Sequence, residues 1–391
     1  MQTTVARMGW DVSLLQLPIY TVHGGRRRRC GMATRSRQRG PGVRDFKACF
    51  AVTLLCFAVA YWRGSHAALG GPSALWLTFV LALLEIGLSF DNAVLNARVL
   101  ERMSERWRRL FLTLGILVAV FAVRLVFPIL IVSTSTGEYP GSVTRMAWED
   151  PDGYARLLNS VYPLISAFGG SFLLLVFLDF VFDGSRDVHW IGRVEKRLAK
   201  AAKFDGSAVL IALCAVSGLR LWLPAPRYFP VLAAAVAGII LYLVVQGIGA
   251  MFMQAQPGVP AKSAWRANFA NFLYLEMLDM SFSFDGVIGA FAVTRDIVVI
   301  ALGLAVGAVF VRSLTLHFVR SGILHRYVYL EHGAHYAIGT LAVAMLACAV
   351  LPVHESSFAS LVGAAFIAAS IWSSIARVQR EARGCATRDG A

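Results

Sequence analysis

The sequence LEIGLSFDN at residues 84–92 places two carboxylates inside an apolar run long enough to cross a membrane. A second sequence, LDMSFSFDG at residues 278–286, repeats its pattern: an acid, then Ser four residues later, then Phe and Asp. Corresponding positions lie 194 residues apart. Charge in hydrocarbon is costly, so an acid within a membrane span is a functional hypothesis by default. The predictions of the fold and of the candidate site start from these two sequences.

A second matched pair of segments follows the first. The sequence GILVAVFAVR at residues 115–124 corresponds to GLAVGAVFVR at residues 303–312, and the offset is 188 residues. In each, a Gly precedes an Arg by nine residues inside an apolar run. Two matched segments in the same order predict an internal duplication.

The composition is that of a membrane protein. Hydrophobic residues make up 57% and charged residues 15%, whereas soluble domains have about 45–50% and about 25%. The net charge of +14 could suggest a nucleic-acid partner. The basic residues cluster in the loops between apolar segments, however, so we predict a lipid bilayer and no nucleic acid as the partner.

Ten apolar segments predict an all-α polytopic membrane protein with about ten transmembrane helices. Residues 1–47 are expected to be a basic disordered segment, residues 48–375 the transmembrane domain, and residues 376–391 a basic cytoplasmic tail. The predicted segments are 48–62, 73–97, 110–134, 157–182, 207–219, 228–253, 267–293, 297–318, 335–351 and 357–375.

The distribution of basic residues gives an orientation. With the N-terminus in the cytoplasm, 29 of the 37 Lys and Arg residues fall in cytoplasmic pieces and only six in outside loops. This asymmetry favours a multi-pass protein of the plasma (inner) membrane with both termini cytoplasmic. The two motifs then run in opposite directions, which predicts an inverted-topology repeat of helices 2–4 (about 73–182) and helices 7–9 (about 267–351).

The motif residues supply oxygen atoms suited to a hard cation such as Mn²⁺, Ca²⁺ or Mg²⁺. The candidate metal ligands are Glu85, Ser89, Asp91, Asn92, Asp279, Ser283 and Asp285. On a regular helix Asp91 and Asp285 lie about 120° away from the face of the other ligands. If all of them meet at one site, the helix must be kinked or unwound near Ser-Phe-Asp. The cation is expected as a substrate, with no tightly bound cofactor.

Arg124 and Arg312 are placed to compensate the negative charge when the site is empty. The empty acids should otherwise take up protons, which makes exchange of protons for the cation a hypothesis. The simpler interpretation is a structural acid–arginine pair that pins neighbouring helices. Glu331, His332 and His335 have helical spacing and are expected at an interface more than at a metal. No nucleotide loop, nucleophile elbow or HExxH motif is present, so no enzyme activity is predicted.

The sequences LEIGLSFDNAV (84–94) and FSFDGVIGAFAVT (282–294) resemble the two signature segments of the TerC family of tellurium-resistance integral membrane proteins. RYVYLEHG (326–333) resembles a further family segment, and RLVFP (124–128) is most similar to a TerC-related branch known as a domain of unknown function. The resemblance covers about residues 70–350 and implies a place in the LysE-type transporter superfamily.

The resemblance also implies metal-ion homeostasis, with manganese efflux as its main theme and tellurite resistance in some members. It carries over Glu85, Asp91, Asn92, Asp279 and Asp285 as site residues. Where the commoner family form has Ser or Asn after the second Asp, this chain has Gly286, which offers no side-chain ligand.

The leading functional hypothesis is a secondary transporter that exports a divalent cation, Mn²⁺ first among the candidates, in exchange for protons. Two alternatives stay open. One is a membrane scaffold that does not transport but delivers metal to cytoplasmic partner proteins during envelope stress. The other is a tellurite or oxyanion resistance protein that uses Arg124 and Arg312.

Overall fold

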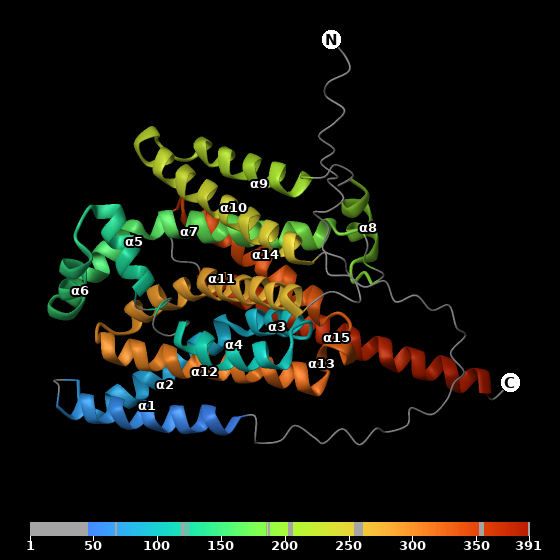
Figure 1. The fold of residues 1–391 in the computed structure, drawn as a ribbon, viewed down its shortest axis with the longest axis horizontal. Helices are drawn as coiled ribbons and strands as arrows, with labels where there is room; N and C mark the ends of the chain where they lie inside the picture. Colours follow the sequence, from blue (N-terminus) through green and yellow to red (C-terminus); the bar gives the residue numbers. More distant parts are fainter. Residues whose placement is uncertain are drawn as a thin grey trace, which may run out of the picture.

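The computed structural model describes residues 46–66, 69–118, 122, 124, 126–184, 186, 188–201, 206–253, 261–351 and 356–389 (Figure 1). Asp285 is described for its backbone only. Throughout these ranges the regular elements are helices, so the prediction of an all-helical chain is confirmed for them. The basic segment predicted for residues 1–47 lies almost entirely outside the described residues.

The described residues form fifteen α-helices. They are α1 (Lys47–Ser65), α2 (Gly71–Leu88), α3 (Phe90–Leu100), α4 (Glu105–Leu117), α5 (Phe127–Thr136), α6 (Pro140–Glu149), α7 (Pro151–Phe182), α8 (Gly192–Ala201), α9 (Ser207–Gly218), α10 (Ala225–Met253), α11 (Ala261–Val293), α12 (Ile297–Ser321), α13 (Ile323–Arg326), α14 (Leu330–Cys348) and α15 (Ser356–Asp389). Helix α15 continues through the segment that the sequence assigned to a tail.

Five helices of the described chain are long and apolar enough to cross a membrane, since a span needs about 20 residues. They are α2, α7, α12 and the segments Ala225–Ile248 of α10 and Leu361–Arg380 of α15. Two shorter apolar helices cover Cys49–Ser65 and Ser207–Leu221. Helix α11 is 33 residues long, but Glu276 and Asp279 near its middle lower its mean hydropathy. The chain is therefore a helical membrane protein, and the count of ten spans stays a prediction.

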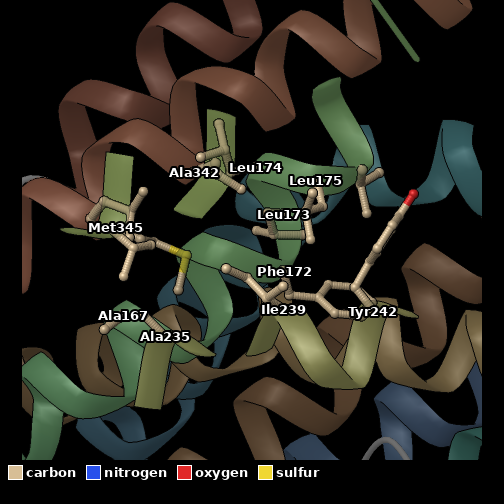
Figure 2. Packing of buried hydrophobic residues seen from close by; sticks show 14 of the residues in the cluster. Ala167, Phe172, Leu173, Leu174, Leu175, Ala235, Ile239, Tyr242, Ala342 and Met345 are labelled. Atoms are coloured by element: carbon tan, nitrogen blue, oxygen red, sulfur yellow. The ribbon is translucent and has the colours of Figure 1, made fainter. Parts of the chain in front are cut away.

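Helix α7 is the centre of the largest core. Figure 2 shows Phe172 and Leu173 of α7 between Ile239 of α10 and Met345 of α14. Gly238 brings α10 close to α7, because a Cβ there would lie 2.2 Å from the carbonyl oxygen of Phe168. Small residues that let helix backbones approach are typical of membrane helix pairs, where apolar burial alone gives little driving force.

A second close contact joins α2 to α12 on the other side of the molecule (Figure 1). Gly303 and Gly307 lie one turn apart on α12. A Cβ at Gly303 would come within 2.5 Å of Leu81 Cβ, and one at Gly307 within 2.4 Å of Glu85 Cβ. These two glycines therefore bring the first motif directly against the helix that carries Arg312.

The helices that carry the matched segments are interrupted in the first half of the chain. Helix α2 ends at Leu88 and α3 begins at Phe90, so Ser89 forms a junction inside the first motif. Between α4 and α5, the described residues Val118, Ala122, Arg124 and Val126 are π-helical. By contrast, α11 runs through the second motif without a break. The kink considered from the sequence is thus present at the first motif and absent at the second.

Candidate functional site

The last turn of α2 and the first turn of α3 present the first motif. Glu85 lies one helical turn before the junction at Ser89, and the Ser89 hydroxyl donates a 3.0 Å hydrogen bond to Glu85 Oε1. Only 1% of Glu85 is exposed. Because burial of an isolated carboxylate is very costly, this side chain needs a positive partner.

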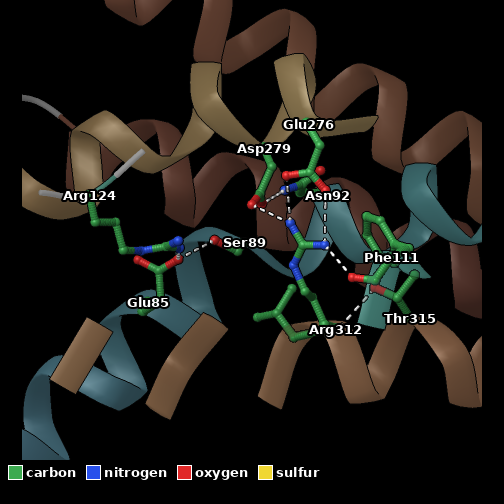
Figure 3. Close-up of polar contacts among 10 residues, drawn as sticks. Glu85, Ser89, Asn92, Phe111, Arg124, Glu276, Asp279, Arg312 and Thr315 are labelled. Atoms are coloured by element: carbon green, nitrogen blue, oxygen red, sulfur yellow. Dashed lines mark hydrogen bonds and ion pairs between the residues drawn. The ribbon is translucent and has the colours of Figure 1, made fainter. Parts of the chain in front are cut away.

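Arg124, in the π-helical segment, is that partner. Its Nη2 donates to Glu85 Oε1 and forms an ion pair with it (Figure 3). The second carboxylate oxygen, Oε2, accepts no hydrogen bond within the described part of the chain. Gly286 of α11 lies beside this oxygen, since a Cβ at that position would come within 2.6 Å of it. The first half-site is therefore one acid, one arginine and one buried oxygen left over.

The second half-site is built around Arg312 of α12, whose side chain is 2% exposed. Its Nη2 donates to Asp279 Oδ2 at 3.0 Å. Its two terminal nitrogens also donate to the two oxygens of Glu276 at 3.2 Å each. Nη1 donates further to the Phe111 carbonyl oxygen at 2.9 Å, and the guanidinium lies 4.1 Å from the centre of the Phe111 ring. Figure 3 shows one guanidinium facing two carboxylates.

Gly115 of α4 makes room for this arrangement. A Cβ at this position would lie 2.3 Å from Arg312 Nη1 and 2.6 Å from Glu276 Oε1. The glycine that begins the first matched segment thus accommodates the arginine that ends the second. A larger residue would have to displace the ion pair.

One hydrogen bond connects the two motifs directly. The Asn92 amide, in the first turn of α3, donates from Nδ2 to Asp279 Oδ1 at 2.9 Å. Both oxygens of Asp279 are therefore engaged, one by Asn92 and one by Arg312. Asn92 Oδ1 is buried and accepts no hydrogen bond among the described residues.

The contacts of the two half-sites correspond to one another. At the offset of 194, Glu85 matches Asp279 and Asn92 matches Gly286, and at the offset of 188 Arg124 matches Arg312. Each acid is paired with the arginine of its own half. Each also faces the residue after the Ser-Phe-Asp of the other half: Asp279 faces Asn92, and Glu85 faces Gly286.

Asp91 lies apart from these two ion-pair clusters. Its Oδ1 accepts a 2.8 Å hydrogen bond from the Asn92 backbone N–H. The residue also lines a cavity of about 370 Å³ whose other lining residues are apolar, among them Phe282 of α11, Ala337 of α14 and Ile367 of α15. The structure thus places Asp91 on the wall of an apolar cavity between α3 and α14–α15.

Two further predicted ligands, Ser283 and Asp285, lie on α11 within the second motif. Ser283 is buried, and its hydroxyl has no hydrogen-bond partner among the described residues. The side chain of Asp285 lies outside the described residues. Across the part of the chain that is described, no group of three or more His, Cys, Asp and Glu side chains is arranged to hold a metal ion. Arginine side chains stand beside Glu85 and Asp279 in this arrangement.

Sequence reasoning missed Glu276, which is 6% exposed and makes two of the bonds to Arg312. The signal was present, because Glu276 is an acid inside an apolar run, three residues before Asp279 and on the same helical face. The matched position in the first half is Ala82, so a comparison of the two motifs passes over it.

The residues Glu331, His332 and His335 lie in a largely buried polar cluster at the start of α14, and their position relative to a membrane surface stays a prediction. Arg98 Nη2 lies 2.9 Å from Glu331 Oε2, and His332 Nε2 is 3.1 Å from the Val188 carbonyl oxygen. Burial alone would raise the pKa of Glu331, but the Arg98 guanidinium together with His335 and His332 lowers it, and the pKa lies below its ordinary value. His335 stacks on Phe180 with ring centres 3.6 Å apart. This cluster ties α3, α7 and α14 together.

Long apolar helices and buried acid–arginine pairs define the class of this chain, a polytopic helical membrane protein with a charged centre. A family model described as "Protein of unknown function (DUF475)" matches residues 90–381, and the chain belongs to this family. The match includes Asp91, Asn92 and the second motif. No curated protein and no solved structure matches the chain.

Proposed function

We propose that this protein is a secondary transporter that exports a divalent cation, with Mn²⁺ as the leading candidate, in exchange for protons. The observation that carries the proposal is the pair of corresponding acid–arginine half-sites at Glu85 and Asp279. Paired half-sites at the meeting point of two repeats are the plan of many secondary transporters, whose substrate sites lie near the membrane midplane. The proposal includes ten spans, an inverted repeat of helices 2–4 and 7–9, and cytoplasmic termini in the plasma membrane.

The resemblance to the TerC family and the LysE-type superfamily supports the choice of cation. The oxygen atoms around the two half-sites come from carboxylates, an amide and hydroxyls, which are the ligands that Mn²⁺ accepts. Three buried oxygens, Glu85 Oε2, Asn92 Oδ1 and Ser283 Oγ, accept no hydrogen bond within the described chain. Buried polar atoms normally find a partner, so these oxygens are available to a bound ion.

In the proposed mechanism the arginines act as tethered counter-ions. While no cation is bound, Arg124 compensates Glu85, and Arg312 is shared between Glu276 and Asp279. An arriving cation takes over the carboxylates, and each guanidinium moves to other partners. Once the cation has left, the carboxylate that is in excess over Arg312 in the second half-site takes up the returning proton.

A second candidate has an observation in its favour. Each acid of the two half-sites is held by an arginine, as in a structural pin between helices. A scaffold that delivers metal to cytoplasmic partners without transport would need no more than this. The tellurite or oxyanion alternative has less support, because the donors of Arg312 already face carboxylates and the Phe111 carbonyl.

Flux in proteoliposomes tests the proposal. Wild-type protein should accumulate Mn²⁺ under an imposed proton gradient, and the Glu85→Gln/Asp279→Asn double variant should lose this flux. Glu149→Gln, in an exposed pair with Arg145, is the control and should transport normally. Wild-type vesicles without Mn²⁺ flux, with soluble partners co-purifying, would favour the scaffold.

A further inference from the structure

Glu276 is the main partner of Arg312, more than Asp279 is. Glu276 receives a two-pronged contact, with Nη1 and Nη2 each 3.2 Å from one of its oxygens. Asp279 receives a single bond from the same guanidinium, at 3.0 Å. Two-pronged arginine–carboxylate pairs fix the orientation of the guanidinium as well as its position.

We propose that Glu276 is a positioning residue that retains Arg312 when Asp279 binds the transported cation. The inference rests on the proposed function. It adds that the contact of Glu276 with Arg312 lets Asp279 release the arginine and bind the cation. Arg312 stays compensated by Glu276, so Asp279 can exchange its guanidinium contact for a metal ion without leaving a buried arginine unpaired.

The remaining contacts of Arg312 support this role. The Phe111 carbonyl accepts from Nη1 at 2.9 Å, and the Phe111 ring lies 4.1 Å from the guanidinium carbon. Gly115 leaves the space in which Arg312 and Glu276 meet. None of these contacts involves Asp279. Arg312 is therefore held against α4 whether or not it is bonded to Asp279.

The charges of the second half-site lead to the same conclusion. One guanidinium faces two carboxylates, which leaves one negative charge in excess among these three side chains. A buried excess charge is costly and attracts a cation or a proton. Without Glu276, Arg312 and Asp279 would form an equal pair, and a metal ion would have to displace the arginine from its only carboxylate.

The matched position in the first half-site carries no second acid. The position that matches Glu276 is Ala82, a buried residue without a carboxylate. The two halves therefore differ: Asp279 shares its arginine with a second acid, whereas the matched position beside Glu85 is an alanine. We expect the Asp279 half to bind the cation first.

The test is a double-mutant cycle with Mn²⁺ as the titrant of the purified full-length protein in nanodiscs. Glu276→Gln should weaken Mn²⁺ binding about tenfold, because Arg312 then competes fully for Asp279. Glu276→Asp keeps the charge and should stay within about threefold of wild type. In an Arg312→Gln background, Glu276→Gln should have no further effect, since no guanidinium competes. Arg312→Met, which is also uncharged, serves as the background if Arg312→Gln does not fold.

The outcomes are distinguishable. Binding that Glu276→Gln leaves unchanged would overturn the positioning role alone. Equal weakening in both backgrounds would also overturn it, because Glu276 would then be a ligand in its own right. Wild-type protein that binds no Mn²⁺ would overturn the proposed function together with this inference. Three results together would support the inference. Glu276→Gln weakens Mn²⁺ binding when Arg312 is present, it has no effect when Arg312 is replaced, and Glu276→Asp binds Mn²⁺ nearly as tightly as wild type.

Discussion

The side-chain amide of Asn92 donates a 2.9 Å hydrogen bond to Asp279 across 187 positions of the chain. This bond joins α3 to α11 and the first motif to the second. It also occupies the one oxygen of Asp279 that Arg312 does not contact. The two motifs therefore form one site, and the contact can be tested by substitution.

Replacement of Asn92 by Ala should destabilise the protein by about 1–3 kcal/mol, because a buried carboxylate oxygen of Asp279 loses its donor. Thermal unfolding of the purified protein in detergent measures the effect. Asn159→Ala, at an exposed position of α7, is the matched control and should leave the midpoint unchanged. Equal midpoints for the Asn92 variant and wild type would show that the bond contributes little.

The ion pair of Glu85 with Arg124 predicts strong coupling between the two residues. Arg124→Gln leaves a buried carboxylate without this partner and should cost about 3–5 kcal/mol. Glu85→Gln/Arg124→Gln removes both charges and should recover most of that loss. Unfolding free energies of the two single variants and the double variant give the coupling. Additive losses would contradict a direct pair.

The glycines of the site predict a steric effect. Gly307→Ala places a methyl group 2.4 Å from Glu85 Cβ, and Gly115→Ala places one 2.3 Å from Arg312 Nη1. Both should lower stability by about 1–3 kcal/mol or more through overpacking. Gly247→Ala in α10 meets no atom within 4 Å and is the control, with little change expected. Size-exclusion profiles and thermal midpoints report the result, and tolerance of Ala at both sites would refute the close packing.

The Arg98–Glu331 pair predicts a dependence on pH. The pKa of Glu331 in the folded protein lies below its ordinary value of 4.5, because Arg98, with smaller contributions from His335 and His332, more than offsets the effect of burial. The pair therefore contributes stability that is fully present above pH 4.5 and is lost as the pH falls through the folded pKa. Thermal midpoints of wild type and Glu331→Gln should differ at pH 7 and converge as the pH falls through the folded pKa of Glu331. A difference that stays constant with pH would contradict this assignment.

The sequence predicted the helices, the two half-sites and the arginines that serve them, because apolar length, charge in hydrocarbon and a repeated spacing are all local signals. It also pointed to the interruption at Ser89. Glu276 was missed because its matched position is Ala82. Helical periodicity placed Asp91 about 120° from the face of Glu85. It could not show that Asp91 faces α14 and α15, because periodicity does not identify the neighbouring helices.

The other features that could not be predicted are contacts between residues far apart in the sequence. Nothing near Gly115 in the sequence indicates that it lies beside Arg312, almost 200 residues away. Likewise, Asn92 was predicted as a ligand from its oxygen, whereas its amide nitrogen makes the contact with Asp279. The ten spans and the inverted repeat are predictions that the described helices leave open.

The central claim is that the acids of the two half-sites bind a divalent cation in competition with their arginines. Calorimetric titration of Mn²⁺ into wild-type protein and into the Glu85→Gln/Asp279→Asn double variant tests it most directly. We predict saturable Mn²⁺ binding by the wild type and its loss in a double variant that stays folded. Binding that survives both substitutions, or a wild type that binds no Mn²⁺, would contradict the claim.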